Sequence, residues 1–541
     1  MGVSLSDDEY LYFVDRAVRT MARIVADLGD EHACTKPDIP GANTPYALLT
    51  HCLGVVEYWA GQVNLGRDVH RDRAAEFTAT GPVADLLART HAVLEQLSAD
   101  VASATDRTEV SAPPAEWASG PDRALSPSGV LMHVYEEVSQ HLGQMEVIRD
   151  ALRVGPPPFD PPMRWLRDKQ GVKWTRPGPD LIPAWVADMD FPVAPPIRAA
   201  LTAMIDRGDL GYPEWSADPL AEAFAGRMKR SFGWAADAAH VKPLADLIQG
   251  VQVLLHLATE ADDGIVAHLP NYPPFPAAIG VTRRRLVPVQ LVPDGPSWSW
   301  DHDALVAAAL QSRVLLLVNP QNPTGRAFTR DELEKLAEVA EEHDLLVISD
   351  EIHAELVHDP YTHIPFASLD ATTAARTVTL TSATKAYNIA GVRTAVAHVG
   401  PQWLRERWDA LPPDLFGQPS TLGVEATVAA WRDCDDWLAA LRRHLRDQRD
   451  HLADRVARMP GVSMQLPDAG YLAWLDCRAA DLPEDPAAYF RAHAGIELAS
   501  GPDYDPAAHG WVRLNFANSR AVLDEILDRM AAVIEARSAR P

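Results

Sequence analysis

Four short, almost uninterrupted apolar runs in the second half of the chain constrain its fold more than any other feature. They are GIVAHL at 264–269, RVLLLV at 313–318, DLLVIS at 344–349 and TVTLTS at 377–382. Strands that are apolar along their whole length are typical of a parallel sheet that is covered on both faces. The segments between them have helical periodicity, and one begins with a capping box of Thr329 and Glu332. The pattern therefore predicts an α/β architecture.

The first 155 residues follow a different pattern. Apolar residues recur three and four positions apart in four stretches, at 6–29, 45–66, 82–104 and 125–153. Four amphipathic helices predict an all-α four-helix bundle. The segment GPPPFDPP, which ends at Pro162, cannot continue a helix. We therefore expect a helical domain over 1–155, a linker over 156–162 and a second domain over 163–541.

Charge and composition restrict the possible partners. The formal net charge of −26 opposes binding to nucleic acid or to an anionic membrane surface. The beginning of the sequence, MGVSLSDDEY, lacks the basic and then apolar run of a secretion signal, and no apolar stretch is long enough to span a bilayer. The four cysteines show no CxxC spacing, so neither disulfides nor a cysteine zinc site is indicated. These features predict a cytoplasmic protein.

Polar residues follow three of the apolar runs at the points where the strands are expected to end. Asn322 lies in NPQNPTG after the second run, Asp350 follows the third, and Lys385 lies in SATK after the fourth. In open α/β sheets, ligands bind beyond the carboxyl ends of the strands. The sequence therefore predicts one site that contains an amide, an acid and an amine.

The motifs NPQNPTG, SDEIH and SATKAYNIAGVR resemble those of fold-type I pyridoxal 5′-phosphate (PLP) enzymes of the aspartate aminotransferase superfamily. WVADMDF, GDLGYP, NYPPF and VRLNFA resemble the cystathionine β-lyase branch of the MalY/PatB type. The resemblance covers about residues 163–541 and implies a homodimer with PLP as cofactor. It also implies a large cofactor domain over about 200–425, and a smaller α+β domain formed by about 426–541 together with 163–199.

The resemblance implies a role for each residue near the reacting atoms. Lys385 is expected to bind the cofactor covalently and to remove the Cα proton of the substrate. Asp350 would keep the pyridine nitrogen protonated, and His353 would support Asp350. Asn322 would bind the 3′-oxygen of the ring. Arg513, in VRLNFA, would hold the substrate carboxylate with its planar guanidinium.

The remaining expected contacts surround the cofactor's phosphate and ring. The phosphate contacts implied by the resemblance are the amides of Gly250 and Val251, Ser382, Arg393 and, from a second subunit, Tyr212. Tyr272 would stack on the ring and take part in catalysis. Simple packing is the alternative for both tyrosines. Asp188 and Asp190 are interpreted as structural residues.

Two reactions are compatible with this set of residues. The MalY/PatB motifs favour β-elimination, which would convert an S-substituted cysteine to a thiol, pyruvate and ammonia. The alternative is a class I/II aminotransferase with a non-catalytic helical interaction domain. The segment KPLADLIQGVQ at 242–252 departs from the usual sequence of the family, so the resemblance does not identify the substrate.

The helical domain carries a second candidate site. His133, Glu137 and His141 recur at intervals of four on one predicted helix, and His51 lies on another. His51, Glu137 and His141 together could hold a divalent, zinc-like metal. Histidines buried in the core of an interaction module are the alternative.

The segments THCLGVVEYW and HVYEEVSQHLGQMEVIRD resemble the DinB superfamily, in particular its metal-dependent thiol S-transferases and mycothiol-dependent isomerases. The resemblance covers about residues 6–154. It implies that the metal activates a low-molecular-weight thiol, and hence a bifunctional fusion of two sulfur-handling domains.

Overall fold

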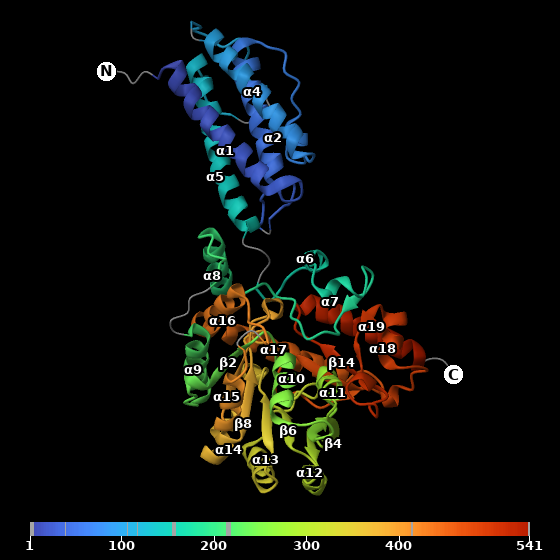
Figure 1. Cartoon of the computed structure of the whole chain (residues 1–541). Coiled ribbons are helices and arrows are strands. Elements are labelled where there is room, and N and C mark those ends of the chain that lie inside the picture. Colours follow the sequence, from blue (N-terminus) through green and yellow to red (C-terminus); the bar gives the residue numbers. More distant parts are fainter. Residues whose placement is uncertain are drawn as a thin grey trace. The chain divides into compact units, whose positions relative to one another are not determined.

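The computed structural model describes residues 5–37, 39–104, 106–115, 117–118, 120–153, 158–212, 218–412 and 415–538. The chain divides into two compact units, Met1–Gly155 and Pro156–Pro541 (Figure 1). Residues 154–157, where the predicted linker begins, lie outside the described residues. The finer division of the second unit into a large and a small domain stays a prediction.

The first unit confirms the predicted helical bundle. Its helices are α1 (Asp7–Ala33), α2 (Pro45–Val56) with its π-helical continuation η1 (Glu57–Val63), the short α3 (Arg73–Glu76), α4 (Val83–Ala104) and α5 (Pro127–Arg153). Helix α1 packs against α2, α4 and α5, and α2 also packs against α4 and α5. A capping box of Ser6 and Glu9 begins α1. The buried side chains of these helices form one apolar core.

The second unit is built on an eight-stranded mixed sheet of order β2-β9-β8-β7-β6-β3-β4-β5. The strands are β2 (Val241–Leu244), β3 (Gly264–Leu269), β4 (Arg285–Asp294), β5 (Ser297–Trp300), β6 (Val314–Val318), β7 (Leu346–Asp350), β8 (Thr377–Thr381) and β9 (Ala395–Val399). The four apolar runs form β3, β6, β7 and β8, which lie parallel and are buried throughout. The predicted α/β architecture is therefore confirmed.

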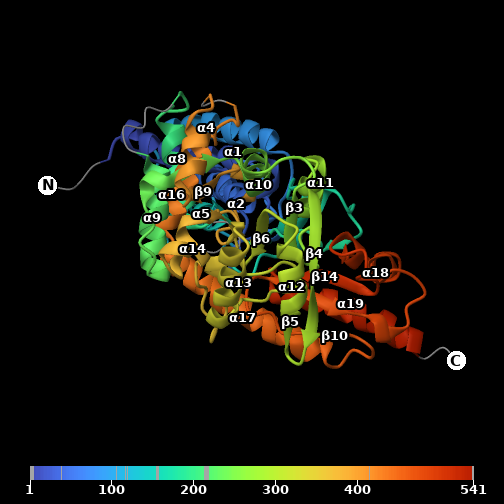
Figure 2. The ribbon, with the colours of Figure 1, turned by 60° about the horizontal axis from the view of Figure 1, so that its bottom comes forward.

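Helices cover both faces of this sheet (Figure 2). Ile265 of β3 packs in the same apolar cluster as α10 (Leu247–Ala258) and α11 (Pro274–Val281). Its neighbour Val266 packs in the cluster that contains α12 (His302–Ala309) and α13 (Arg330–Glu342). Successive side chains of a strand point to opposite faces, so two apolar layers require uninterrupted apolar strands. The predicted capping box of Thr329 and Glu332 begins α13.

The other helices of the second unit lie before and after the sheet in the sequence or within its connections. They are α6 (Met163–Arg167), α7 (Val172–Thr175), α8 (Pro195–Asp206), α9 (Pro219–Phe232), α14 (Ala371–Ala375), α15 (Gln402–Asp409), α16 (Thr421–Asp433), α17 (Asp435–Val456), α18 (Pro486–Ala494) and α19 (Arg520–Ser538). Among the described helices, none has the length and apolarity that crossing a bilayer requires.

A smaller antiparallel sheet of order β10-β11-β14-β13 confirms the predicted α+β region toward the C-terminal end of the chain. Its strands are β10 (Ser463–Met464), β11 (Leu472–Asp476), β13 (Ala499–Ser500) and β14 (Trp511–Asn515). A separate pair joins β1 (Ile182–Pro183) to β12 (Ile496–Glu497). This pair holds the start of the second unit against its C-terminal part.

Candidate active site

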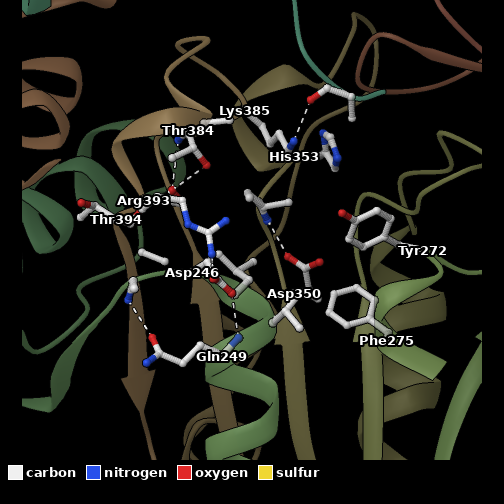
Figure 3. A pocket seen from close by; sticks show the side chains of 18 of the residues that line it. Asp246, Gln249, Tyr272, Phe275, Asp350, His353, Thr384, Lys385, Arg393 and Thr394 are labelled. Carbon is white, nitrogen blue, oxygen red and sulfur yellow. Dashed lines mark hydrogen bonds and ion pairs between the residues drawn. The ribbon is translucent and has the colours of Figure 1, made fainter. Parts of the chain in front are cut away.

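A cavity of about 450 Å³ lies beyond the carboxyl ends of β6, β7 and β8 (Figure 3). Asn322 follows β6, Asp350 ends β7, and Ser382 and Lys385 follow β8, and all four line the cavity. The carboxyl ends of parallel strands meet at one edge of a sheet. The fold therefore brings the predicted amide, acid and amine to one place.

The amino group of Lys385 is in direct contact with a backbone carbonyl of another residue that lines the cavity. Its Nζ atom donates a hydrogen bond of 2.7 Å to the carbonyl of Ala187, which also accepts a bond of 3.0 Å from the hydroxyl of Tyr471. Burial lowers the pKa of the Lys385 amino group. A lowered pKa favours the neutral amine, the form that can attack an aldehyde or accept a proton.

Asp350 is buried at the end of β7 (Figure 3). Its Oδ1 atom accepts a hydrogen bond of 3.0 Å from the amide of Ile352, and burial raises its pKa to about 7. His353 lines the same cavity, and burial lowers its pKa to about 3, so its imidazole is neutral. Within the described part of the chain, Nδ1 of His353 has no hydrogen-bond partner. The expected support of Asp350 by His353 stays a prediction.

Arg513 lies on β14 and its guanidinium reaches Asn322. Nη1 donates to Oδ1 of Asn322 at 3.0 Å, and Nη2 donates to the carbonyl of Trp185 at 2.6 Å. The side chain is buried over the ring of Tyr504, at 4.9 Å from the ring centroid. Among the described residues, nothing accepts from its Nε atom. An unsatisfied buried guanidinium nitrogen suits an incoming carboxylate.

The prediction for the phosphate amides is wrong. Helix α10 begins at Leu247, so the amide of Gly250 already bonds to the carbonyl of Asp246 at 3.1 Å and Val251 is fully buried in the core. The first-turn amides, which lack helical partners, belong to Leu247 and Ile248. Asp246 caps the helix, and an aspartate directly before the apolar run LIQGVQVLL was the available signal.

Two other predicted phosphate ligands, Ser382 and Arg393, line the same end of the cavity. Ser382 donates its hydroxyl proton to the carbonyl of Thr394 at 2.6 Å. Arg393 lines the cavity and forms an ion pair with Asp246 (Figure 3). Asp246 and Gln249 also line it, and neither was predicted.

The two predicted tyrosines have different surroundings. Tyr272 follows β3 and lines the cavity next to Phe275, with the ring centroids 5.7 Å apart. Tyr212 is fully exposed and is not among the cavity residues of a single chain. Its expected contact needs a second subunit and stays a prediction.

Asp190 has surroundings that fit its structural interpretation. Its carboxylate is buried, with Oδ1 at 3.0 Å from Nζ of Lys173 and accepting a hydrogen bond of 2.8 Å from Trp174. Lys173 also donates to the carbonyl of Asp188 at 3.0 Å. These contacts hold the segment that presents the Ala187 carbonyl to Lys385.

The helical unit brings His51, Glu137 and His141 together, with one possible ligand atom of each within 4.8 Å of the others. Oε2 of Glu137 lies 3.9 Å from Nε2 of His51 and 3.8 Å from Nε2 of His141. The interaction with His51 lowers the pKa of Glu137. This set of two imidazoles and one carboxylate can bind a divalent metal and leave further positions open.

Partners that the sequence did not predict orient both imidazoles. Nδ1 of His51 lies 2.8 Å from Oε2 of Glu76, and Nδ1 of His141 lies 2.8 Å from Oε1 of Gln144. When Nδ1 donates to these oxygens, each Nε2 is left with a lone pair facing Glu137. His133 instead packs its ring against Trp59, with centroids 4.7 Å apart.

In the large sheet, β7 and β8 are parallel and β9 is antiparallel to β8. This sheet and the residues of the cavity define the fold-type I α/β domain of PLP-dependent enzymes. Residues 186–530 match the family model "Aminotransferase class I and II", and the chain belongs to this family. Residues 10–154 match the model "Mycothiol-S-transferase". Both predicted resemblances are thus confirmed.

Known proteins align with the second unit. The chain is 34% identical to Protein MalY of Escherichia coli over 64% of the chain and 90% of that protein. It is 30% identical to a cystathionine beta-lyase of Corynebacterium glutamicum over 68% of the chain and 99% of that protein. A PLP-bound C-S lyase from Staphylococcus hominis superposes with a TM-score of 0.64 at 28% identity, over 68% of the chain and 96% of that structure. The chain is therefore a member of the C-S lyase group of PLP-dependent enzymes.

Proposed function

We propose that the second unit is a C-S β-lyase that binds PLP in the cavity and converts an S-substituted cysteine to a thiol, pyruvate and ammonia. The meeting of Lys385, Asp350 and Asn322 in one cavity, with Arg513 bonded to Asn322, supports this proposal most strongly. The relatives named as cystathionine beta-lyase and C-S lyase support the choice of reaction. Bound PLP supplies an electron sink, so that loss of the Cα proton can be followed by departure of a thiolate from Cβ.

Polar groups in and next to the cavity fit this cofactor and substrate. Asp350, whose pKa is raised by burial, would gain a charged partner in a protonated pyridine nitrogen. The Nε atom of Arg513, which has no partner in the described structure, would bond the substrate carboxylate. Leu247 and Ile248 would offer their amides to the phosphate, in place of the amides that the sequence predicted.

The other residues named by the resemblance are proposed to act as follows. Lys385 would hold the cofactor and move the Cα proton, because burial favours its neutral amine. Tyr272 would stack on the cofactor ring, Asn322 would bond the ring oxygen, and Ser382 and Arg393 would contact the phosphate. Tyr212, exposed in one chain, would reach the phosphate of a partner subunit in a homodimer.

Product analysis distinguishes the lyase from an aminotransferase. The purified protein is incubated with S-substituted cysteines, cystathionine among them, without any keto acid. We expect stoichiometric pyruvate, ammonia and free thiol. Amino transfer to added keto acids without pyruvate formation would instead identify the aminotransferase.

Arg513→Lys is expected to raise KM for the amino acid about 10- to 100-fold with a smaller effect on kcat, since lysine lacks the planar pair of donors. Initial rates over a range of substrate concentrations measure both constants. The exposed Arg330, changed to lysine, is the matched control. An unchanged KM in Arg513→Lys would assign the substrate carboxylate to another residue.

We further propose that the first unit binds a zinc-like divalent metal at His51, Glu137 and His141 and uses it to activate a low-molecular-weight thiol. The close approach of the three side chains and the match to the mycothiol-S-transferase model support this. A metal lowers the pKa of a bound thiol and so generates the nucleophilic thiolate. Its S-conjugates, once trimmed to cysteine conjugates, would be substrates for the second unit.

His51→Ala is expected to weaken zinc binding by about 100-fold or more and to abolish thiol transfer, with little change in folding. Competitive zinc titration and thermal unfolding of the full chain measure the two effects. His133→Ala removes a buried histidine that packs on Trp59 instead, and should retain the metal. The interaction-module alternative predicts two other results. The wild-type protein would not bind zinc, and the His51→Ala variant would unfold.

A further inference from the structure

The phosphate end of the cavity contains a carboxylate whose charge opposes a phosphate. Asp246 lines the cavity together with Arg393, and the two form an ion pair (Figure 3). Among the described residues that line the cavity, the basic side chains of lysine or arginine are those of Lys385 and Arg393. Lys385 is proposed to bind the aldehyde of the cofactor. The Arg393 guanidinium, the side-chain charge left for a phosphate among the described lining residues, is therefore already paired with a carboxylate.

The local structure keeps Asp246 in this position. Its Oδ1 atom caps α10 by accepting the amide of Gln249 at 2.8 Å, while Oδ2 contacts Nη2 of Arg393. Gln249 in turn accepts from the amide of Ala245 at 2.9 Å and donates to the carbonyl of Phe416. Rotation of Asp246 away from Arg393 would therefore disturb the cap of the helix that offers its amides to the phosphate.

The charges lead to a clear competition. A phosphate monoester carries between one and two negative charges near neutral pH. To bind Arg393 it must displace the Asp246 carboxylate or lie next to it, and like charges at contact distance repel each other. Ser382, Thr384 and Gln249, which also line this end, are neutral and bring no further positive charge to it.

We propose that Asp246 competes with the cofactor's phosphate for Arg393, so that this chain holds PLP weakly and exchanges it with the solution. The inference rests on the proposed binding of PLP in the cavity. It concerns the phosphate alone, so the affinity for pyridoxal, which lacks the phosphate, should not depend on Asp246.

The test is a titration of the cofactor-free full chain with PLP and, in parallel, with pyridoxal, followed by absorbance. Asp246→Asn and Asp246→Ser remove the charge and keep a residue that can cap a helix. We expect both to lower Kd for PLP about 10-fold or more, with Kd for pyridoxal changed less than about twofold. Inorganic phosphate should also compete with PLP at lower concentration in these variants.

Asp301→Asn is the matched control, because Asp301 caps α12 through the same type of side-chain contact. It should leave both dissociation constants unchanged, and thermal unfolding of each cofactor-free variant checks that it folds. PLP binding that neither Asp246 variant tightens would overturn the competition alone. Absence of PLP and pyridoxal binding in every variant would overturn the proposed lyase function, and this inference with it.

Discussion

Lys385→Ala is expected to lower the rate of pyruvate formation from an S-substituted cysteine by about ten-thousand-fold or more. One side chain is proposed both to hold the cofactor and to move the Cα proton, and general acid-base catalysis alone is worth up to about ten-thousand-fold. Continuous pyruvate assays at saturating PLP measure the loss. Saturating PLP is needed so that weak cofactor binding is not mistaken for a catalytic defect.

Chemical labelling makes this expectation specific to one position. Borohydride reduction of the PLP-loaded protein, followed by peptide mapping, is expected to find the pyridoxyl group on Lys385 and none on the variant. Lys335→Ala, which removes an exposed lysine from α13, should change neither label nor rate. A label on another lysine would refute the assignment of Lys385.

Asp350→Asn is expected to lower kcat by about a thousand-fold, because an amide cannot stabilise a protonated pyridine nitrogen and the cofactor then withdraws electrons poorly. Steady-state kinetics at saturating PLP measure the effect. Asp370→Asn, a change in the exposed cap of α14, is the matched control. A variant that retains wild-type kcat would show that the ring nitrogen has another partner.

In the cofactor-free protein, the same substitution is expected to increase stability near neutral pH and above. Burial raises the pKa of Asp350 from 3.8 to about 7, so between these values the folded protein binds more protons than the unfolded chain. This group therefore lowers stability as the pH rises from about 4 to about 7. Cofactor-free Asp350→Asn should unfold at a higher temperature than the wild type at pH 8, and the difference should shrink toward pH 4.

The two proposed activities imply an order of reactions, in which the first unit acts before the second. Each activity can be tested separately. A metal-bound thiolate forms a C–S bond, and a β-lyase breaks a C–S bond of a cysteine conjugate. The two activities are distinguished by the variants above, since His51→Ala addresses thiol transfer and Lys385→Ala addresses pyruvate formation.

Much of the architecture was predictable because it depends on local chemistry. Uninterrupted apolar strands such as 314–318 fit only a sheet that is covered on both faces, so the sequence predicted this architecture directly. Lys385 and Asp350 lie at the carboxyl ends of such strands, and parallel strands place these ends at one edge of the sheet, so their meeting was predictable. The helical periodicity of the first 155 residues likewise predicted its four long helices.

The phosphate amides were assigned to the wrong residues because the first turn of α10 begins earlier in the chain. The resemblance implied the amides of Gly250 and Val251, whereas the capping aspartate lies four residues before Gly250. Backbone hydrogen bonding decides such cases, since an amide that already donates within a helix cannot also bind a ligand. The ion pair between Asp246 and Arg393 joins residues far apart in the chain, and no local pattern indicates it.

The sequence by itself determined the fold class, the catalytic motifs and the likeness of both units to sulfur-handling families, because these depend on periodicity and on short-range spacing. Only the tertiary structure decided which groups surround each site: Glu76 behind His51, Asn322 beside Arg513, and Asp246 against Arg393. These contacts link elements distant in sequence, and their geometry depends on how helices and sheets pack rather than on any local preference of the chain.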